Sequence, residues 1–310
     1  MAFQRPDIIR PPSEWKSYFL PLTSGCSNNT CTFCNYYGST LRLREPEEAM
    51  QEIDALALYR KSGVTLRTMP YIVYAIARNW DGKRVFLQDG DALVYPFPKL
   101  KRVLEHLNEK LPNLDRISAY ATAKDIIRRD VQELKQLKDL KLTFFYMGVE
   151  SGDDEILKRV RKRETYSEMV EAGHKVKEAG IGLSATIILG LGGVENSRKH
   201  ALSCARILSE IDPEFAAALT LIIVPGTPME EEIKRGNFHL ITPFESLEEL
   251  KLIIENANFT NCFFTSMHAS NYLPVRVRLP EEKNKIIKDL ERILAKKDPS
   301  LLKPEYFRAL

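Results

Sequence analysis

The hydrophobic pattern alternates between short apolar runs and longer amphipathic segments. The run IGLSATIILG (residues 181–190) has the length and the β-branched residues of a buried strand, and RKHALSCARILSEI after it carries apolar residues at helical spacing. This succession of strand and helix occurs six times. The predicted strands are residues 18–22, 84–88, 116–122, 142–150, 181–190 and 215–224. Strands that each precede a helix predict parallel pairing, with the helices outside the sheet.

Six units are fewer than the eight of a closed barrel, so the pattern predicts an α/β fold with a partial (β/α)6 TIM-type barrel, open on one side. Residues 1–15 are a predicted N-terminal arm, and residues 16–236 are the predicted barrel. The alternation stops at Asn237, and residues 237–310 predict a smaller, α-rich C-terminal extension that closes the barrel. Residues 64–82 are compatible with a helix or with an inserted pair of strands.

Composition narrows the class of protein only slightly. A chain of 310 residues with 44% hydrophobic content can bury a large core. Its 45 basic and 42 acidic residues are too balanced to indicate a nucleic-acid partner, although they do not exclude RNA. No apolar run reaches the length of a membrane span, and the N-terminus lacks the apolar stretch of a secretory signal. We therefore expect a cytoplasmic protein whose thiols stay reduced.

Three of the five cysteines, Cys26, Cys31 and Cys34, lie in the segment SGCSNNTCTFCNYYG at residues 24–38. A structural zinc site normally has four protein ligands, and no second CxxC or CxxH pair supplies the fourth. Iron–sulfur clusters are also usually held by four cysteines, so a triad would leave one iron open for chemistry. The alternative is a set of loop thiols or a disulfide, which the absence of a signal peptide disfavours.

The unusual sequence motifs all follow predicted strands. In barrels of parallel strands the chemistry collects at the C-terminal strand ends, where the loops that lead into the helices meet. The cysteine segment follows the first predicted strand. The second, fourth, fifth and sixth predicted strands are followed by QDGDALVYP, GVESGDDEILKRVRK, GLGG and VPGTP, respectively. We therefore expect these segments to form one site.

The cysteine segment with an aromatic residue before its last cysteine, the GVESGDDEILKRVRK segment and the PGTP turn together resemble the radical S-adenosylmethionine (SAM) superfamily. The most similar branch contains the Elongator catalytic subunit, the methylthiotransferases and oxygen-independent coproporphyrinogen oxidase. The resemblance covers about residues 16–230. One departure is the spacing CxxxxCxxC, where the commonest family spacing is CxxxCxxC.

The resemblance implies a four-iron, four-sulfur cluster on Cys26, Cys31 and Cys34, with SAM bound at the open iron. It also implies reductive cleavage of SAM to a 5′-deoxyadenosyl radical that abstracts hydrogen from the substrate, so the enzyme would be oxygen-sensitive. An electron donor such as flavodoxin or ferredoxin is the implied partner. The cofactors carry the difficult chemistry, and the protein places the radical against one C–H bond and excludes water.

The family motifs assign candidate SAM contacts in the first half of the chain. Phe33 matches the aromatic residue near the adenine, and its alternative role is loop packing. Gly90 and Asp91 match the segment that contacts the SAM amino group, although DGD could also be only a turn. Glu150 can accept hydrogen bonds from the ribose hydroxyls. The competing role, capping the next helix, suits Ser151 better, because Ser151 and Asp154 have capping-box spacing.

Two further contacts are implied for the methionyl part of SAM. Lys162 matches the basic residue that pairs with the SAM carboxylate. Arg161 and Arg163 flank it, so a solvated basic helix end is the alternative. The GLGG segment that begins at Gly190 is not a dinucleotide-binding fingerprint, and it would let the backbone approach SAM.

The remaining cysteines and the segment at residues 262–280 are less specific. Cys204 lies in an amphipathic stretch, which predicts a small buried thiol. In CFFTSMHASNYLPVRVRLP, His268, Asn271 and Tyr272 stand between apolar runs, and we predict that they face the substrate. Tyr272 or Cys262 would then return a hydrogen atom or a proton. The alternative is a structural turn in which Asn271 caps the chain reversal and Tyr272 packs in the core.

Three functions follow from these motifs. The leading hypothesis is a radical SAM enzyme acting on a small or medium organic substrate in cofactor, tetrapyrrole or lipid metabolism. The second is a radical SAM enzyme that modifies RNA. The third is a non-enzymatic zinc or iron–sulfur protein with a structural or interaction role. Two isolated cysteines cannot build the further cysteine-rich site of methylthiotransferases, so that activity ranks lower.

Overall fold

The computed structural model describes residues 3–309, which form two compact units. The first unit comprises the described residues up to Asn29 together with residues 38–146 and 175–182. The second unit comprises residues 30–37, 147–174 and 183 onward. The sheet has the strand order β1-β4-β5-β6-β7-β8-β9-β10. Strands β6 and β7 contribute residues to both units, and so does helix α7, which is described below with the second unit.

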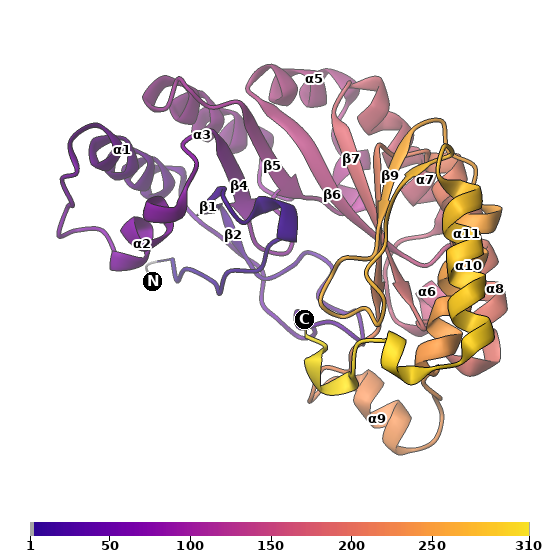
Figure 1. The fold of residues 1–310 in the computed structure, drawn as a ribbon. Coiled ribbons are helices and arrows are strands. Elements are labelled where there is room, and N and C mark those ends of the chain that lie inside the picture. Colours follow the sequence, from indigo (N-terminus) through magenta and orange to yellow (C-terminus); the bar gives the residue numbers. More distant parts are fainter. Residues whose placement is uncertain (1–2, 310) are drawn as a thin grey trace. The chain divides into compact units, whose positions relative to one another are not determined.

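The first unit contains four parallel strands and the helices that join them (Figure 1). Its strands are β1 (Tyr18–Pro21), β4 (Arg84–Gln88), β5 (Arg116–Tyr120) and the first part of β6 (Leu142–Glu150). A small hairpin pairs β2 (Thr23–Ser24) with β3 (Arg42–Leu43). The helices are η1 (Pro12–Glu14), α1 (Pro46–Ser62), α2 (Tyr71–Asn79), α3 (Phe97–Lys110), α4 (Ala123–Ile127) and α5 (Val131–Asp139).

Local sequence explains where the long helix α1 begins and ends. Pro46 occupies its first turn, where a missing N–H costs nothing, and Gly63 ends it with a left-handed φ of 71°. Helix α1 packs against α2 and α3. The segment at residues 64–82, compatible with helix or strand from sequence, contains helix α2.

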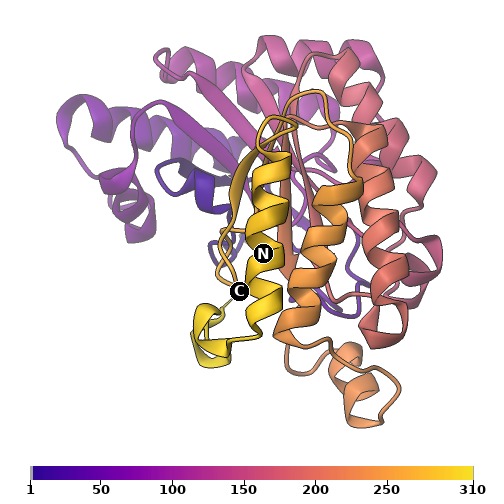
Figure 2. The ribbon, with the colours of Figure 1, turned by 45° about the vertical axis from the view of Figure 1, so that its right-hand side comes forward.

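The second unit continues the sheet with β7 (Gly182–Leu189), β8 (Phe215–Thr220) and β9 (Cys262–Thr265), which are parallel, and with β10 (Arg276–Leu279), which is antiparallel to β9. Its helices are α6 (Asp154–Arg159), α7 (Tyr166–Glu178), α8 (Gly193–Ile211), α9 (Pro228–Lys234), α10 (Pro243–Asn256) and α11 (Lys283–Lys296), followed by η2 (Pro299–Leu301) and η3 (Glu305–Phe307). Helix α10 lies between α8 and α11 and contacts both (Figure 2).

The α/β class with a mostly parallel sheet is confirmed. The predicted C-terminal extension supplies strands β9 and β10 to the sheet as well as helices, because the apolar residues of CFFT alternate between a buried and a partly exposed side. The predicted boundaries at residues 15 and 236 stay predictions. Within residues 3–309, no helix has both the length and the apolar character needed to cross a membrane.

Candidate functional site

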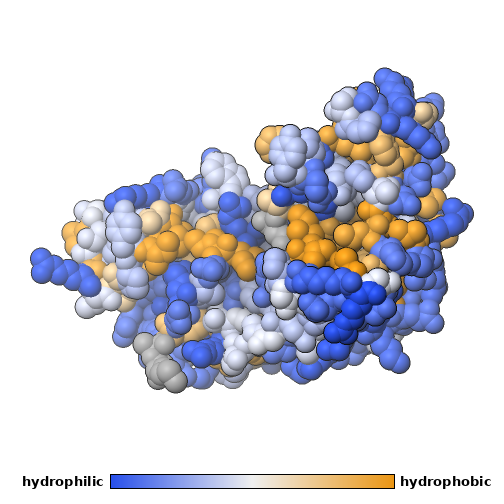
Figure 3. All heavy atoms as spheres, turned by 90° about the horizontal axis from the view of Figure 1, so that it is seen from below, coloured by the Kyte–Doolittle hydropathy of each residue, from blue (hydrophilic) through white to orange (hydrophobic). Residues whose placement is uncertain are grey.

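The part of the cysteine segment that belongs to the second unit is fixed by main-chain hydrogen bonds. Thr32 N–H donates to Val160 O (2.9 Å), and Thr32 O accepts from Met229 N–H (3.1 Å) at the start of α9. The Thr30 hydroxyl donates to Arg161 O (2.9 Å). Residues 30–34 are therefore held between the turn after α6 and the first turn of α9, on the side where β8 ends. Figure 3 shows one face of the molecule, on which hydrophobic residues are exposed among hydrophilic ones.

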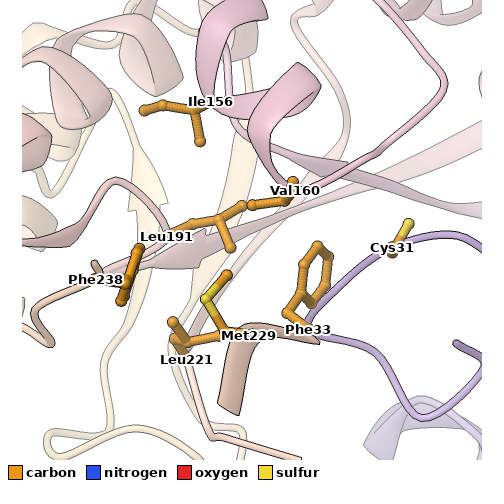
Figure 4. Packing of buried hydrophobic residues seen from close by; sticks show 8 residues of the cluster. All are labelled: Cys31, Phe33, Ile156, Val160, Leu191, Leu221, Met229 and Phe238. Atoms are coloured by element: carbon orange, nitrogen blue, oxygen red, sulfur yellow. The ribbon is translucent and has the colours of Figure 1, made fainter. Parts of the chain in front are cut away.

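Phe33 packs in a buried hydrophobic cluster of the second unit. The other buried members are Cys31, Ile156, Val160, Leu191, Leu221, Met229 and Phe238. Figure 4 shows the Phe33 ring pointing toward Val160, with Cys31 at the edge of the cluster. These apolar side chains would shield from water a cofactor bound next to Phe33. The predicted contact of Phe33 with adenine stays a prediction.

All five cysteines are free thiols. Burial raises the pKa of Cys31 to about 12, although the nearby Lys162 ammonium lowers it, and burial also raises the pKa of Cys34. A buried thiol releases its proton when it binds a metal ion, because coordination stabilises the thiolate. Soft thiolates on a short loop beside an apolar wall are a donor set that fits an iron–sulfur cluster.

Cys26 lies in the first unit, whereas Cys31 and Cys34 lie in the second. Its Sγ is 3.9 Å from Gly90 O. The turn before it requires glycine, because Gly25 has a φ of 88° and a Cβ there would stand 2.7 Å from Thr40 O. Across residues 3–309, no three His, Cys, Asp or Glu side chains are grouped so as to hold a metal ion. The three-cysteine ligand set therefore rests on the sequence motif.

Asp91 is fully buried in the first unit, where its carboxyl group forms a hydrogen bond with that of Asp125. The Ser27 hydroxyl lies 2.5 Å from Asp91 Oδ2 and 3.0 Å from Asp125 Oδ2. Burial and the hydrogen bond with Asp125 raise the pKa of Asp91 well above its usual value, which favours the protonated form of Asp91. The carboxylate form that would pair with an ammonium group is therefore disfavoured at Asp91 in the folded protein. The predicted contact of Gly90 and Asp91 with the SAM amino group stays a prediction.

Lys162 lies in a buried ionic cluster at the end of β6. Its Nζ donates to Gly148 O (2.6 Å) and to Glu150 Oε1 (3.3 Å), and it forms an ion pair with Glu164 Oε2 (3.1 Å). Burial lowers the pKa of Lys162, but the two carboxylates outweigh burial and raise it well above its usual value. Sequence reasoning missed Glu164, which is 3% exposed.

The exposure pattern separates Lys162 from its neighbours. Arg161 and Arg163 are exposed, whereas Lys162 is buried. The alternative of a solvated basic helix end therefore applies to the two arginines and not to Lys162. Glu150 adopts a φ of 63°, a left-handed conformation that is uncommon for a residue with a side chain. This conformation ends β6 beside Lys162, where strained residues often mark a functional site. The predicted roles of Glu150 and Lys162 toward SAM stay predictions.

The predicted capping box of Ser151 and Asp154 is wrong. Helix α6 begins two residues later than that box requires, and its N-cap is Asp153, whose carboxylate accepts from Glu155 N–H (2.9 Å) and Ile156 N–H (3.2 Å). The Ser151 hydroxyl instead accepts from Asp153 N–H (3.1 Å) and lies 3.0 Å from His200 Nδ1.

His200 is a fully buried histidine that sequence reasoning did not single out. Its Nε2 lies 2.9 Å from Ile188 O, so this nitrogen donates while Nδ1 accepts from the Ser151 hydroxyl. Burial lowers its pKa to about 4. The neutral imidazole therefore joins helix α8 to the ends of β6 and β7. Cys204, one turn further along α8, is a buried thiol as predicted.

Gly190 ends β7 with a φ of 82°, and the carboxylate of Glu249 holds its N–H at 2.7 Å. Burial raises the pKa of Glu249 to about 7. This glutamate on α10 was also missed, since a glutamate in an amphipathic helix usually faces solvent. The predicted approach of Gly190 to SAM stays a prediction.

The segment at residues 262–280 forms β9, a loop and β10. Cys262 is fully buried in β9, Asn271 and Tyr272 are buried in the loop, and His268 is partly exposed. The predicted catalytic roles of Cys262, His268 and Tyr272 stay predictions.

A family profile and several individual proteins are similar to this chain. The profile of the Radical SAM superfamily matches residues 20–205. A putative methylthiotransferase of Methanocaldococcus jannaschii is 22% identical over 85% of this chain and 55% of its own length. The threonylcarbamoyladenosine tRNA methylthiotransferase MtaB of Rickettsia prowazekii is 24% identical over 84% of this chain and 60% of its own length.

Among solved structures, coproporphyrinogen III oxidase (HemN) from Escherichia coli has a TM-score of 0.54 and 14% identity, over 77% of this chain and 51% of that one. This similarity shows that the two proteins share the fold. The chain spans roughly half of the length of the curated relatives that it matches.

Proposed function

Because the chain belongs to the radical SAM superfamily, we propose that it is an enzyme that binds SAM and a four-iron, four-sulfur cluster and modifies RNA. Its proposed cluster ligands are Cys26, Cys31 and Cys34. When bound, the cluster would supply the electron for the reductive cleavage of SAM that leads to hydrogen abstraction from the substrate. The sequence motif carries this assignment, and thiolates are the ligands that iron–sulfur clusters take.

The chain's own residues would bind and orient SAM. Glu150 would accept the ribose hydroxyls, and Lys162 would meet the SAM carboxylate by exchanging one of its present acceptors. Asp91, next to Gly90, would meet the amino group. Phe33, set in its apolar cluster, would cover the adenine and exclude water. Gly190 would allow the backbone to approach the methionyl part.

The observation that carries the choice of RNA is that tRNA methylthiotransferases align with most of this chain. We do not extend the proposal to methylthiolation, because the match covers 60% and 49% of the length of these two relatives. RNA modification thus ranks above the small-molecule substrate that the sequence first favoured.

Exposed basic side chains next to the cysteine segment support an RNA substrate. They are Lys158, Arg161 and Arg163. Among the described residues, no ion pair joins these three side chains to a carboxylate. The hydrogen bond from Thr30 to Arg161 O places Arg161 beside the cysteine segment. Side chains of this kind suit contacts with RNA phosphates.

The test is an anaerobic assay of 5′-deoxyadenosine formation by the reconstituted protein. We expect a pool of unmodified tRNA transcripts to stimulate product formation, and a low-molecular-weight cell extract to have no such effect. The reverse result would contradict RNA modification and return the small-molecule hypothesis to first place. Zinc in place of iron, with no SAM binding, would indicate the non-enzymatic alternative.

Filter binding to the same transcripts tests the basic surface directly. Replacing its three side chains together by alanine should reduce the slope of log K against log salt by about 2, since each phosphate contact to single-stranded RNA contributes ~0.7. The matched control replaces three exposed lysines of α11, namely Lys285, Lys288 and Lys296. Equal effects of the two triple variants would argue against a specific surface.

A further inference from the structure

The loop at residues 266–275 joins β9 to β10. It lies where the parallel strands have their C-terminal ends, next to the end of β8. Strand β9 is parallel to β8, so its C-terminal end lies at the same edge as that of β8. The main chain confirms this position, because Thr220 N–H at the end of β8 donates to the Ser270 hydroxyl (3.2 Å). In parallel α/β folds this edge carries the reacting groups.

Two of the loop's polar side chains are fully engaged in holding it. Asn271 Nδ2 donates to Ala218 O (2.8 Å) and Ser266 O (2.9 Å), and its Oδ1 accepts from the Thr220 hydroxyl (2.9 Å). The Tyr272 hydroxyl lies 2.7 Å from Glu305 Oε2. Asn271 and Tyr272 are both buried, so neither offers its polar atoms to a ligand.

His268 differs because only one of its ring nitrogens is engaged. Nδ1 accepts from Ser270 N–H (3.2 Å) and lies 2.9 Å from the Ser270 hydroxyl. A backbone N–H can only donate, so Nδ1 is the acceptor and the proton of the neutral imidazole is on Nε2. Burial and Lys303 lower the pKa of His268, which favours this neutral form. Among the described residues, Nε2 has no hydrogen-bond partner.

Arg308 clamps the loop from the C-terminal segment. Its Nε donates to Ser270 O (2.6 Å), its Nη2 to Leu221 O (2.7 Å) and its Nη1 to the Tyr272 hydroxyl (2.5 Å). The guanidinium also lies 4.2 Å from the centre of the Tyr272 ring. Only the planar guanidinium can reach these acceptors at once. The clamp fixes Ser270, and Ser270 fixes the His268 ring.

We propose that His268 donates a hydrogen bond from Nε2 to an acceptor atom of the substrate, and that Arg308 is the positioning residue that holds the imidazole for this contact. The identity of the substrate as RNA rests on the proposed function. A base carbonyl, a ring nitrogen or a phosphate oxygen of RNA can each accept this hydrogen bond.

The tautomer and the clamp can be tested without a substrate. In protein labelled with 15N-histidine, long-range proton–nitrogen correlation should show His268 with the proton on Nε2, assigned by the signals missing from His268→Asn. Arg308→Lys keeps the positive charge but lacks the planar guanidinium that holds Ser270. In this variant the His268 signals should no longer show a proton on Nε2 alone. Arg292→Ala, at an exposed arginine of α11, should leave it unchanged. A proton on Nδ1, or an unchanged signature in Arg308→Lys, would overturn the proposal.

The substrate contact is tested with the pool of tRNA transcripts. His268→Asn should weaken binding about tenfold, the effect of one hydrogen bond, while His268→Gln, whose amide reaches the Nε2 position, should stay within about threefold of the original. The transcripts should also protect His268 from carbethoxylation by diethyl pyrocarbonate. If the RNA binds but neither effect occurs, His268 is not the contact. If the unaltered protein binds no RNA, the RNA function fails, while the nitrogen signature still decides the role of Arg308.

Discussion

Glu249 should make the folded protein less stable as the pH rises. In the fold its pKa is about 7, whereas its ordinary value is 4.5, because burial disfavours the carboxylate. A raised pKa means that the folded state binds a proton more tightly than the unfolded state does. The stabilisation is therefore complete below about pH 4.5 and is lost as the pH rises through about 7.

The size of this effect follows from the two pKa values. Each unit of difference corresponds to 1.36 kcal/mol, so the loss between pH 4.5 and pH 8 is about 3 kcal/mol. Glu249→Gln keeps an oxygen that can accept the Gly190 N–H but removes the ionisation. We therefore expect the variant to be about 2 to 3 kcal/mol more stable than the unaltered protein at pH 8, and nearly equal to it at pH 5.

Urea unfolding at pH 5 and at pH 8 measures this difference. Glu248→Gln is the matched control, because Glu248 is the neighbouring residue of the same helix and is exposed. Its free energy of unfolding should change by less than about 0.5 kcal/mol at either pH. The reasoning is refuted if Glu249→Gln has the same effect at both pH values, or if it lowers the stability at pH 8.

Three other changes test the remaining groups. His200→Ala should lower the free energy of unfolding by about 2 to 4 kcal/mol at pH 7.5 and by less at pH 4.5. The folded protein holds this histidine neutral, so its stabilising contribution is lost as the pH falls from 6.5 toward about 4. Equal losses of stability at the two pH values would contradict this. Lys162→Ala should weaken SAM binding by about 1.5 to 3 kcal/mol and Arg163→Ala by much less, measured by calorimetry; equal small losses would remove Lys162 from the SAM site. Cys31→Ala should abolish SAM cleavage, whereas Cys204→Ala should keep its iron, and loss of iron from the latter would overturn the ligand assignment.

Sequence reasoning located the elements because their signals are local. The run of residues 181–190 and the amphipathic segment after it correspond to β7 and α8, since period and length decide both. The cysteine segment was equally visible, because unusual residues stand close together in the chain. The capping box failed because Ser151 had a distant partner in His200, which the local pattern does not contain.

The buried polar groups could not be predicted for the same reason. Glu248 and Glu249 are adjacent and chemically identical, yet one is exposed and the other holds the backbone of Gly190, 59 residues away. Arg308 is bonded to Leu221 O, 87 residues away. Which polar residue of an amphipathic helix or tail turns inward depends on the packing of distant elements, and the spacing of residues along the chain carries little of that information.

The anchoring of Thr32 on both sides determines where the cysteine segment can change in length. Its N–H is bonded to Val160 O and its C=O to Met229 N–H, and Cys34 N–H donates to Cys31 O (3.2 Å). An inserted residue between Cys31 and Cys34 would break at least one of these bonds. Between Cys26 and Cys31, an added residue can be taken up before the anchored stretch begins. An insertion is therefore tolerated in the first interval and not in the second, and the fourth intervening residue, which this chain adds to the common spacing, falls in the tolerant one.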